Sequence, residues 1–67
     1  MTPHQLQRAL DRLGLSQRGT ARLLGVDERT MRKWIAGNAR IPEAVAKLLR
    51  VMIRHKLTPE DVDKLDT

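Results

Sequence analysis

Residues 16–37, SQRGTARLLGVDERTMRKWIAG, decide the fold of this chain. Ser16 and Asp27 are residue types that start helices, because their side-chain oxygens accept hydrogen bonds from the free N–H groups of a first turn. Gly25 ends a helix and redirects the chain, because glycine adopts positive φ at small steric cost. The stretch therefore predicts two short helices that meet at a tight corner. These helices span about 17–24 and 28–36.

The second of these helices divides into an apolar face and a polar face. At about 100° per residue, Met31, Trp34 and Ile35 lie on one side and are predicted to point inward. The opposite arc carries long polar side chains, which can reach base edges in a DNA major groove about 12 Å wide. A tight corner with such an outer face predicts a helix-turn-helix over about 17–36. We expect base contacts from Glu28, Arg29, Arg32 and Lys33.

Polar residues around this outer face are predicted to contact DNA phosphates. Gln17 opens the first of the two helices, where free backbone N–H groups also bind anions. Arginines project from the same helix and from the loop after the second helix. Contacts of this kind position a protein on DNA without specifying sequence. The expected phosphate-contacting residues are Gln17, Arg18, Arg22, Thr30 and Arg40.

Three more helices are predicted outside the central stretch. Segment 2–5, TPHQ, is a capping box with proline at the first helical position, and it opens a helix of roughly residues 3–13. A proline opens the longest helix, about 42–55, and segment 58–61, TPED, caps a short fifth helix. No stretch alternates between apolar and polar residues as a strand would. The fold prediction is one all-α domain over residues 1–67, a compact bundle of four to five helices.

Charge is unevenly distributed along the chain. Residues 1–57 carry twelve basic and four acidic side chains, whereas residues 58–67 carry one basic and four acidic side chains. A basic body with an acidic tail favours a polyanionic partner, and the partner predicted here is double-stranded DNA. The alternative is a charged surface that serves solubility alone.

Composition argues against other classes of protein. Cysteine, Phe and Tyr are absent and Trp34 is the single aromatic residue, which disfavours a base-stacking surface for RNA or single strands. No run approaches the roughly 20 apolar residues of a membrane span, so we expect a soluble, cytoplasmic protein without a membrane partner. His4 and His55 have no partners at ligand spacing, and no nucleophile–base pair appears. We therefore predict no metal, no cofactor and no enzymatic activity.

The central stretch contains a series of residues at characteristic spacing. The series consists of Ser16-Gln17, Ala21, Leu24-Gly25-Val26, Thr30-Met31-Arg32-Lys33-Trp34, Gly37 and Pro42. With this series the chain resembles the Cro/CI-type (XRE-like) repressor family over about residues 4–57. The resemblance implies a lambda repressor-like DNA-binding domain in which Gln17 contacts phosphate. It also implies base contacts from Glu28, Arg29 and Lys33, with Arg32 as a frequent neighbour.

The short basic form of the chain resembles a narrower group of regulators. Met31-Arg32-Lys33-Trp34 and the Ile41-Pro42 helix start are similar to those of small phage and mobile-element regulators, including anti-CRISPR-associated autorepressors. This resemblance implies a bacterial or phage-encoded transcription regulator that acts at its own promoter. The chain departs from the wider family at Thr20, where leucine is usual, and at Gly19 and Leu23.

The helix over about 42–55 has a wider apolar surface than one core contact needs. The apolar residues that lie outside its main core-facing side predict a second contact surface, and hence a homodimer. Such a dimer would place two base-reading helices about 34 Å apart on an inverted repeat. One alternative is a fifth helix that folds back and covers these residues within the monomer. Another is an antitoxin-like protein-interaction module that uses the same apolar surface. The expected interface residues are Val51, Ile53, Leu57, Val62 and Leu65.

Overall fold

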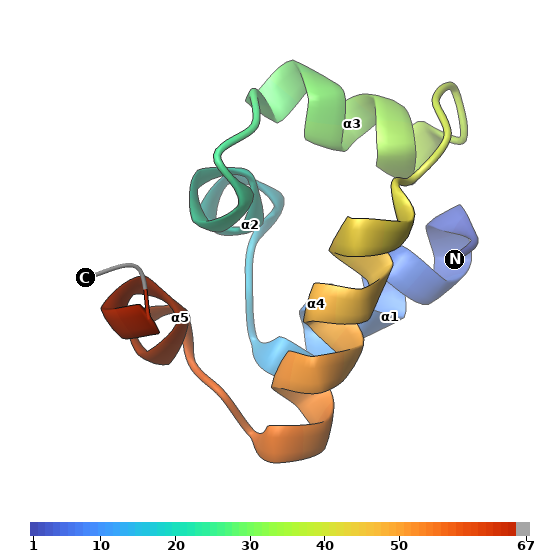
Figure 1. Cartoon of the computed structure of the whole chain (residues 1–67). Helices are drawn as coiled ribbons and strands as arrows, with labels where there is room; N and C mark the ends of the chain where they lie inside the picture. The colour runs from blue at the N-terminus through green and yellow to red at the C-terminus, as the bar shows by residue number, and fades with distance from the viewer. Residues whose placement is uncertain (66–67) are drawn as a thin grey trace.

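The computed structural model describes residues 1–65, and the side chains of residues 1–64. Within that range the chain forms helices and no strand, which confirms the all-α prediction (Figure 1). The predicted start of the fourth helix is corrected by one residue, because Pro42 is its N-cap and has extended backbone angles. The helices are α1 (Pro3–Leu13), α2 (Gln17–Leu24), α3 (Glu28–Ala36), α4 (Glu43–His55) and α5 (Pro59–Leu65).

Side-chain caps fix where the first helices begin. The Thr2 hydroxyl accepts from the Gln5 amide at 3.1 Å, while the Gln5 side chain accepts from the Thr2 amide at 2.9 Å. This capping box confirms the one predicted from the sequence. Ser16 caps α2 by accepting from the Gly19 amide at 2.9 Å. Asp27 stands at the N-cap of α3 as predicted, but its side chain accepts no hydrogen bond from the first turn, so that part of the prediction is wrong.

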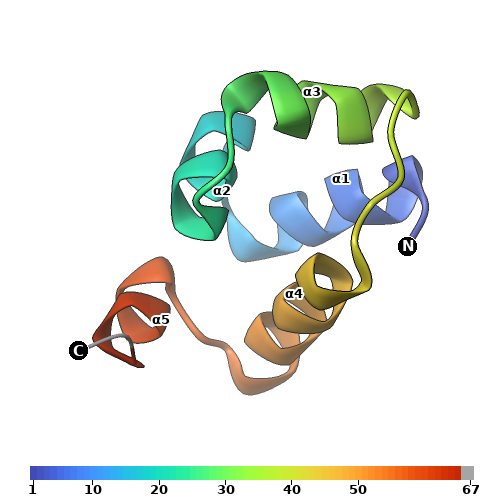
Figure 2. The same ribbon diagram turned by 45° about the horizontal axis from the view of Figure 1, so that its top comes forward.

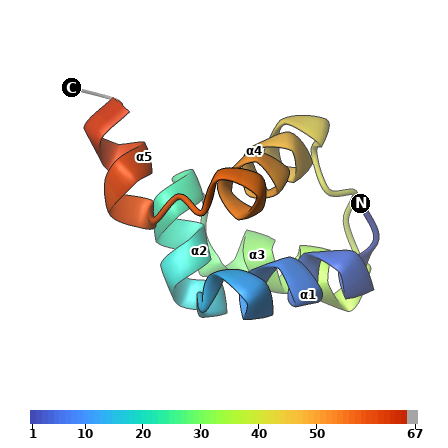
Figure 3. The same ribbon diagram turned by 90° about the horizontal axis from the view of Figure 1, so that it is seen from below.

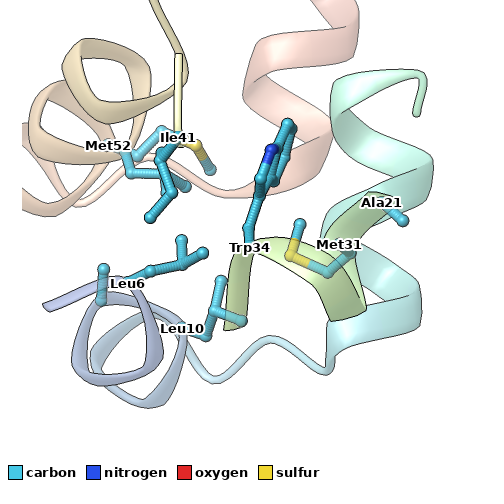
Figure 4. Close-up of a cluster of buried hydrophobic side chains, with 9 residues drawn as sticks. Leu6, Leu10, Ala21, Met31, Trp34, Ile41 and Met52 are labelled. Carbon is cyan, nitrogen blue, oxygen red and sulfur yellow. The ribbon is translucent and has the colours of Figure 1, made fainter. Parts of the chain in front are cut away.

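The hydrophobic core lies where α1, α3 and α4 converge. Trp34 of α3 is only 5% exposed, and Figure 4 shows it between Ile41 and Met52 on one side and Met31 on the other. Burying a large apolar side chain of this kind contributes about 1.5–3 kcal/mol. The structure thus confirms that the apolar face of α3 points inward. The largest fully buried apolar side chains are Leu6, Leu10, Met31, Leu49 and Met52.

Helix α3 is held from two sides. It packs against α2 across a turn that contains Gly25, whose φ of 72° is left-handed as predicted. It also packs against α1, and α1 in turn packs against α4 (Figure 2). The buried Thr20 of α2 donates its hydroxyl to the Ser16 carbonyl at 2.8 Å, which satisfies its polar group inside the protein. The turn and these contacts fix the angle between α2 and α3.

The link from α4 to α5 differs from the other helix ends because no glycine forms it. Lys56 adopts φ 54° and caps α4 in the left-handed conformation, which costs a residue with a Cβ about 1–2 kcal/mol. After this turn α5 lies on the side of the molecule where α2 is found (Figures 1 and 3). Val62 of α5 packs against the core of its own chain.

Helix α5 begins with a second reciprocal cap. The Thr58 amide donates to an Asp61 carboxylate oxygen at 2.9 Å, and the Asp61 amide donates to the Thr58 hydroxyl at 3.2 Å. The predicted cap over segment 58–61 is therefore confirmed. Hydrogen bonds from the Thr58 backbone, and then from its side chain, hold the pKa of Asp61 below its ordinary value of 3.8.

This lowered pKa makes the start of α5 sensitive to acid. Because the folded-state pKa of Asp61 lies below the unfolded value, its stabilising effect is complete above that value and is lost as pH falls through the folded pKa. We expect the Thr58 amide resonance to shift as Asp61 is protonated, with a midpoint below the ordinary pKa of 3.8. The Asp61→Asn variant should show no such titration. A Thr58 amide that moves equally in both proteins would contradict the assignment.

Candidate nucleic-acid interface

The α3 outer face consists of the side chains that sequence analysis assigned to base contacts: Glu28, Arg29, Arg32 and Lys33. All four are exposed, while Met31 and Trp34 on the opposite side of the helix are buried. Long donors and one carboxylate acceptor therefore project from a helix whose other side is fixed in the core. Such an arrangement can present hydrogen-bonding groups to a flat or grooved ligand at defined positions.

The structure pairs Glu28 with a residue that the sequence did not suggest. Its carboxylate lies 3.2 Å from the Arg18 guanidinium of α2. The pairing follows from the tight turn, which brings the start of α2 close to the start of α3. An open hollow of about 150 Å³ at this point is lined by Gln17, Arg18, Glu28 and Arg32.

The candidate phosphate contacts lie at both ends of the α3 outer face. Gln17 and Arg18 belong to the first turn of α2, beside the N-terminal end of α3, and Arg22 follows one turn later. Arg40 lies in the loop between the C-terminal end of α3 and the start of α4. The three arginines are exposed, whereas Gln17 and Thr30 are half-buried. The structure thus places Gln17 and Arg18 beside the N-terminal end of α3 and Arg40 beyond its C-terminal end.

The predicted dimer residues do not form one continuous exposed patch. Ile53, Leu57 and Val62 are half-buried and pack against the core of their own chain. Val51 is 45% exposed, and it is the large apolar side chain most open to solvent in the described part of the chain. The side chain of Leu65 lies outside the described residues. In this arrangement Val62 of α5 packs against the core, but α5 does not cover Val51.

Sequence reasoning missed a group of arginines on another side of the molecule. Arg8 and Arg12 of α1 and Arg50 of α4 line one groove, although they were counted only toward net charge. The spacing of Arg8 and Arg12 by four residues placed them on one helix face. Their proximity to Arg50 depends on the packing of α1 against α4, which no local pattern reveals.

No family model, curated protein or solved structure matches this chain. No helix within residues 1–65 combines the length and the apolar character needed to cross a lipid bilayer.

The Arg18–Glu28 ion pair should contribute little to stability. Its side chains are 81% and 49% exposed, and exposed pairs contribute about 0–1 kcal/mol. We expect Glu28→Gln to change the free energy of unfolding by less than about 0.5 kcal/mol in urea denaturation. Met31→Ala, which removes a fully buried side chain, should lower it by about 2–5 kcal/mol. A large loss for Glu28→Gln would show that the pair is needed to fold the corner between α2 and α3.

Proposed function

We propose that the chain is a sequence-specific regulator that binds double-stranded DNA, with α2 and α3 as a helix-turn-helix of the Cro/CI type. The observation that carries this proposal is the α3 outer face, which exposes four long polar side chains on a helix anchored by Met31 and Trp34. In this proposal α3 enters the major groove, where side chains on a rigid helix can distinguish base pairs.

Base reading falls to the α3 outer face. Arg29 and Lys33 are exposed and form no ion pair in the described part of the chain, so their donors are free for guanine O6 and N7. Glu28 forms an ion pair with Arg18 in the free protein. On DNA it can exchange this partner for a cytosine amino group, which releases Arg18 toward a phosphate. The ion pair thus keeps both groups near the positions where DNA would contact them.

Phosphate contacts fall to residues around the α3 outer face. The free N–H groups at the start of α2 and the side chain of Gln17 suit one phosphate, while Arg22 and Arg40 suit others. Thr30 supplies a hydroxyl from α3. These contacts fix the orientation of α3 and carry no sequence information, so they account for affinity and salt dependence.

Two copies of the chain would read an inverted repeat. The exposed Val51 on α4 supplies an apolar anchor for self-association. Occupancy of an operator by such a homodimer would block polymerase, at the promoter of its own gene in the simplest circuit. The chain would act in a bacterial cytoplasm, whether bacterial or phage-encoded, as a repressor without a cofactor.

The proposal is tested by selection of bound sequences from a randomised DNA pool. Enrichment of an inverted repeat with half-sites about one helical turn apart would support a dimeric regulator. Weak binding without any enriched sequence would reject base reading. An antitoxin-like interaction module would then be the better account of the chain, with Val51 as part of its contact surface.

Two arginine variants separate base reading from phosphate contact. Arg29→Ala should lose about 1–3 kcal/mol of preference at one base pair and leave other positions unchanged. Arg22→Ala should weaken binding to all sequences alike and reduce the log–log salt slope by about 0.9. Fluorescence anisotropy with the selected site and its single-base variants measures both effects. The same uniform loss for both variants would contradict the assignment of Arg29.

The role of Val51 in self-association is tested by sedimentation. We expect Val51→Asp to shift micromolar protein from dimer to monomer while its helical circular dichroism is retained, because 45% of the residue is already exposed. Val51→Ala, which removes less apolar surface, should shift the equilibrium less. Wild-type protein that sediments as a monomer, both alone and on the selected DNA, would reject the dimer.

A further inference from the structure

Helices α1 and α4 form a basic groove, here called the α1/α4 groove. It is an open hollow of about 250 Å³ whose lining includes Arg8, Arg12 and Arg50. The buried Ala9 and the half-buried Ile53 form its least exposed part. All three arginines are exposed, and no carboxylate lines the groove. Three positive groups thus surround one hollow without an internal counter-charge.

Neighbouring charges extend this groove into two rows. On α4, Lys47 and Arg54 share a helix face with Arg50, since they lie three and four residues from it. On α1, Arg8 and Arg12 are four residues apart. None of these five cations forms an ion pair within the described part of the chain.

Two carboxylates border the same surface. Asp11 lies beside the α1 row and accepts from the Gln7 side-chain amide at 3.1 Å. Glu43 begins α4 at one end of the Lys47 row. Neither carboxylate lines the α1/α4 groove. With five cations and two carboxylates, the surface has a net positive charge.

The basic surface and the α3 outer face belong to different sides of the molecule. Figure 3 looks onto α1 and α4 with α3 behind them. The molecule extends about 20 Å along its shorter axes, so a duplex held by α3 cannot at the same time lie straight along the α1/α4 groove. Two separate anionic segments are therefore needed to neutralise the positive charge of both surfaces at once.

We propose that the α1/α4 groove is a second DNA-binding surface, which takes the phosphate backbone of a duplex segment other than the one held by α3. Two rows of unpaired guanidinium and ammonium groups fit a linear array of phosphates better than a single small anion. No carboxylate lines the groove, and its cations are spread over two helices rather than projected from one helix into a major groove. It therefore binds DNA without sequence preference and bridges two duplexes. This inference depends on the proposed function in one respect, because it assumes that α3 binds DNA.

The test is a bridging assay. One duplex that carries the selected site is immobilised, and a fluorescent duplex of random sequence is captured through the protein. We expect the triple variant Arg8→Gln, Arg12→Gln, Arg50→Gln to reduce capture about tenfold or more. Its affinity for the selected site alone should change less than about threefold, because the α3 outer face is intact. Equal capture by wild type and triple variant would overturn the proposal.

Two controls distinguish DNA binding by the α1/α4 groove from DNA binding by α3 and from dimer formation. Arg29→Ala/Lys33→Ala should lose preference for the selected site yet still shift the amide resonances of residues 8–12 and 47–54 when random duplex is added. Sedimentation must show the same oligomeric state for wild type and triple variant, since a dimer can also join two duplexes through its two α3 helices. Loss of capture together with dissociation of the dimer would overturn the proposal.

Two further outcomes also test the proposal for the α1/α4 groove. If selection yields no preferred site, base reading by α3 fails, and the assay with two random duplexes still measures the groove separately. Binding of an Asp- and Glu-rich peptide at residues 8–12 and 47–54, with no shift there on adding duplex, would overturn the DNA assignment. The groove would then be a site for an acidic protein.

Discussion

The position of α3 depends on two side chains, Met31 and Trp34, that are buried in one cluster with residues of α1 and α4. A helix of nine residues is too short to be stable by itself in water, so this burial is what maintains it. The same contacts determine which side of α3 is exposed. The orientation of Arg29 and Lys33 is thus a consequence of apolar packing on the opposite side of the helix.

Charge on this small molecule is arranged around that core. The α3 outer face carries cations on one side, the α1/α4 groove carries a second set, and α5 begins with acidic residues. The Arg18–Glu28 pair is an ion pair between α2 and α3, whereas Arg29 and Lys33 of the α3 outer face and the arginines of the α1/α4 groove form none in the described part of the chain. Unpaired like charges repel each other in the folded state, and a bound polyanion removes that repulsion. Under the proposed function, bound DNA would therefore add to the stability of this short chain.

Sequence patterns predicted those features that depend on neighbouring residues in the chain. Glycines and capping residues marked the helix ends to within one residue, and the 3.6-residue period identified Met31 and Trp34 as buried. Sequence patterns did not predict contacts that depend on how the helices pack against one another. Arg18 meets Glu28 because of the angle between α2 and α3, and Arg50 meets the α1 arginines because α1 packs on α4. Lys56 was missed for a different reason, since a lysine gives no signal of left-handed backbone.

The burial of Trp34 has an optical consequence. It is the single aromatic residue of the chain, so all tryptophan emission comes from the core on the inner side of α3. An indole in an apolar environment emits at shorter wavelength than one in water, so the emission maximum reports directly whether α3 is docked. The polar side chains of α3 lie on the opposite side of the same helix. The intrinsic fluorescence of this protein therefore reads the anchoring of α3 separately from whatever touches its outer surface.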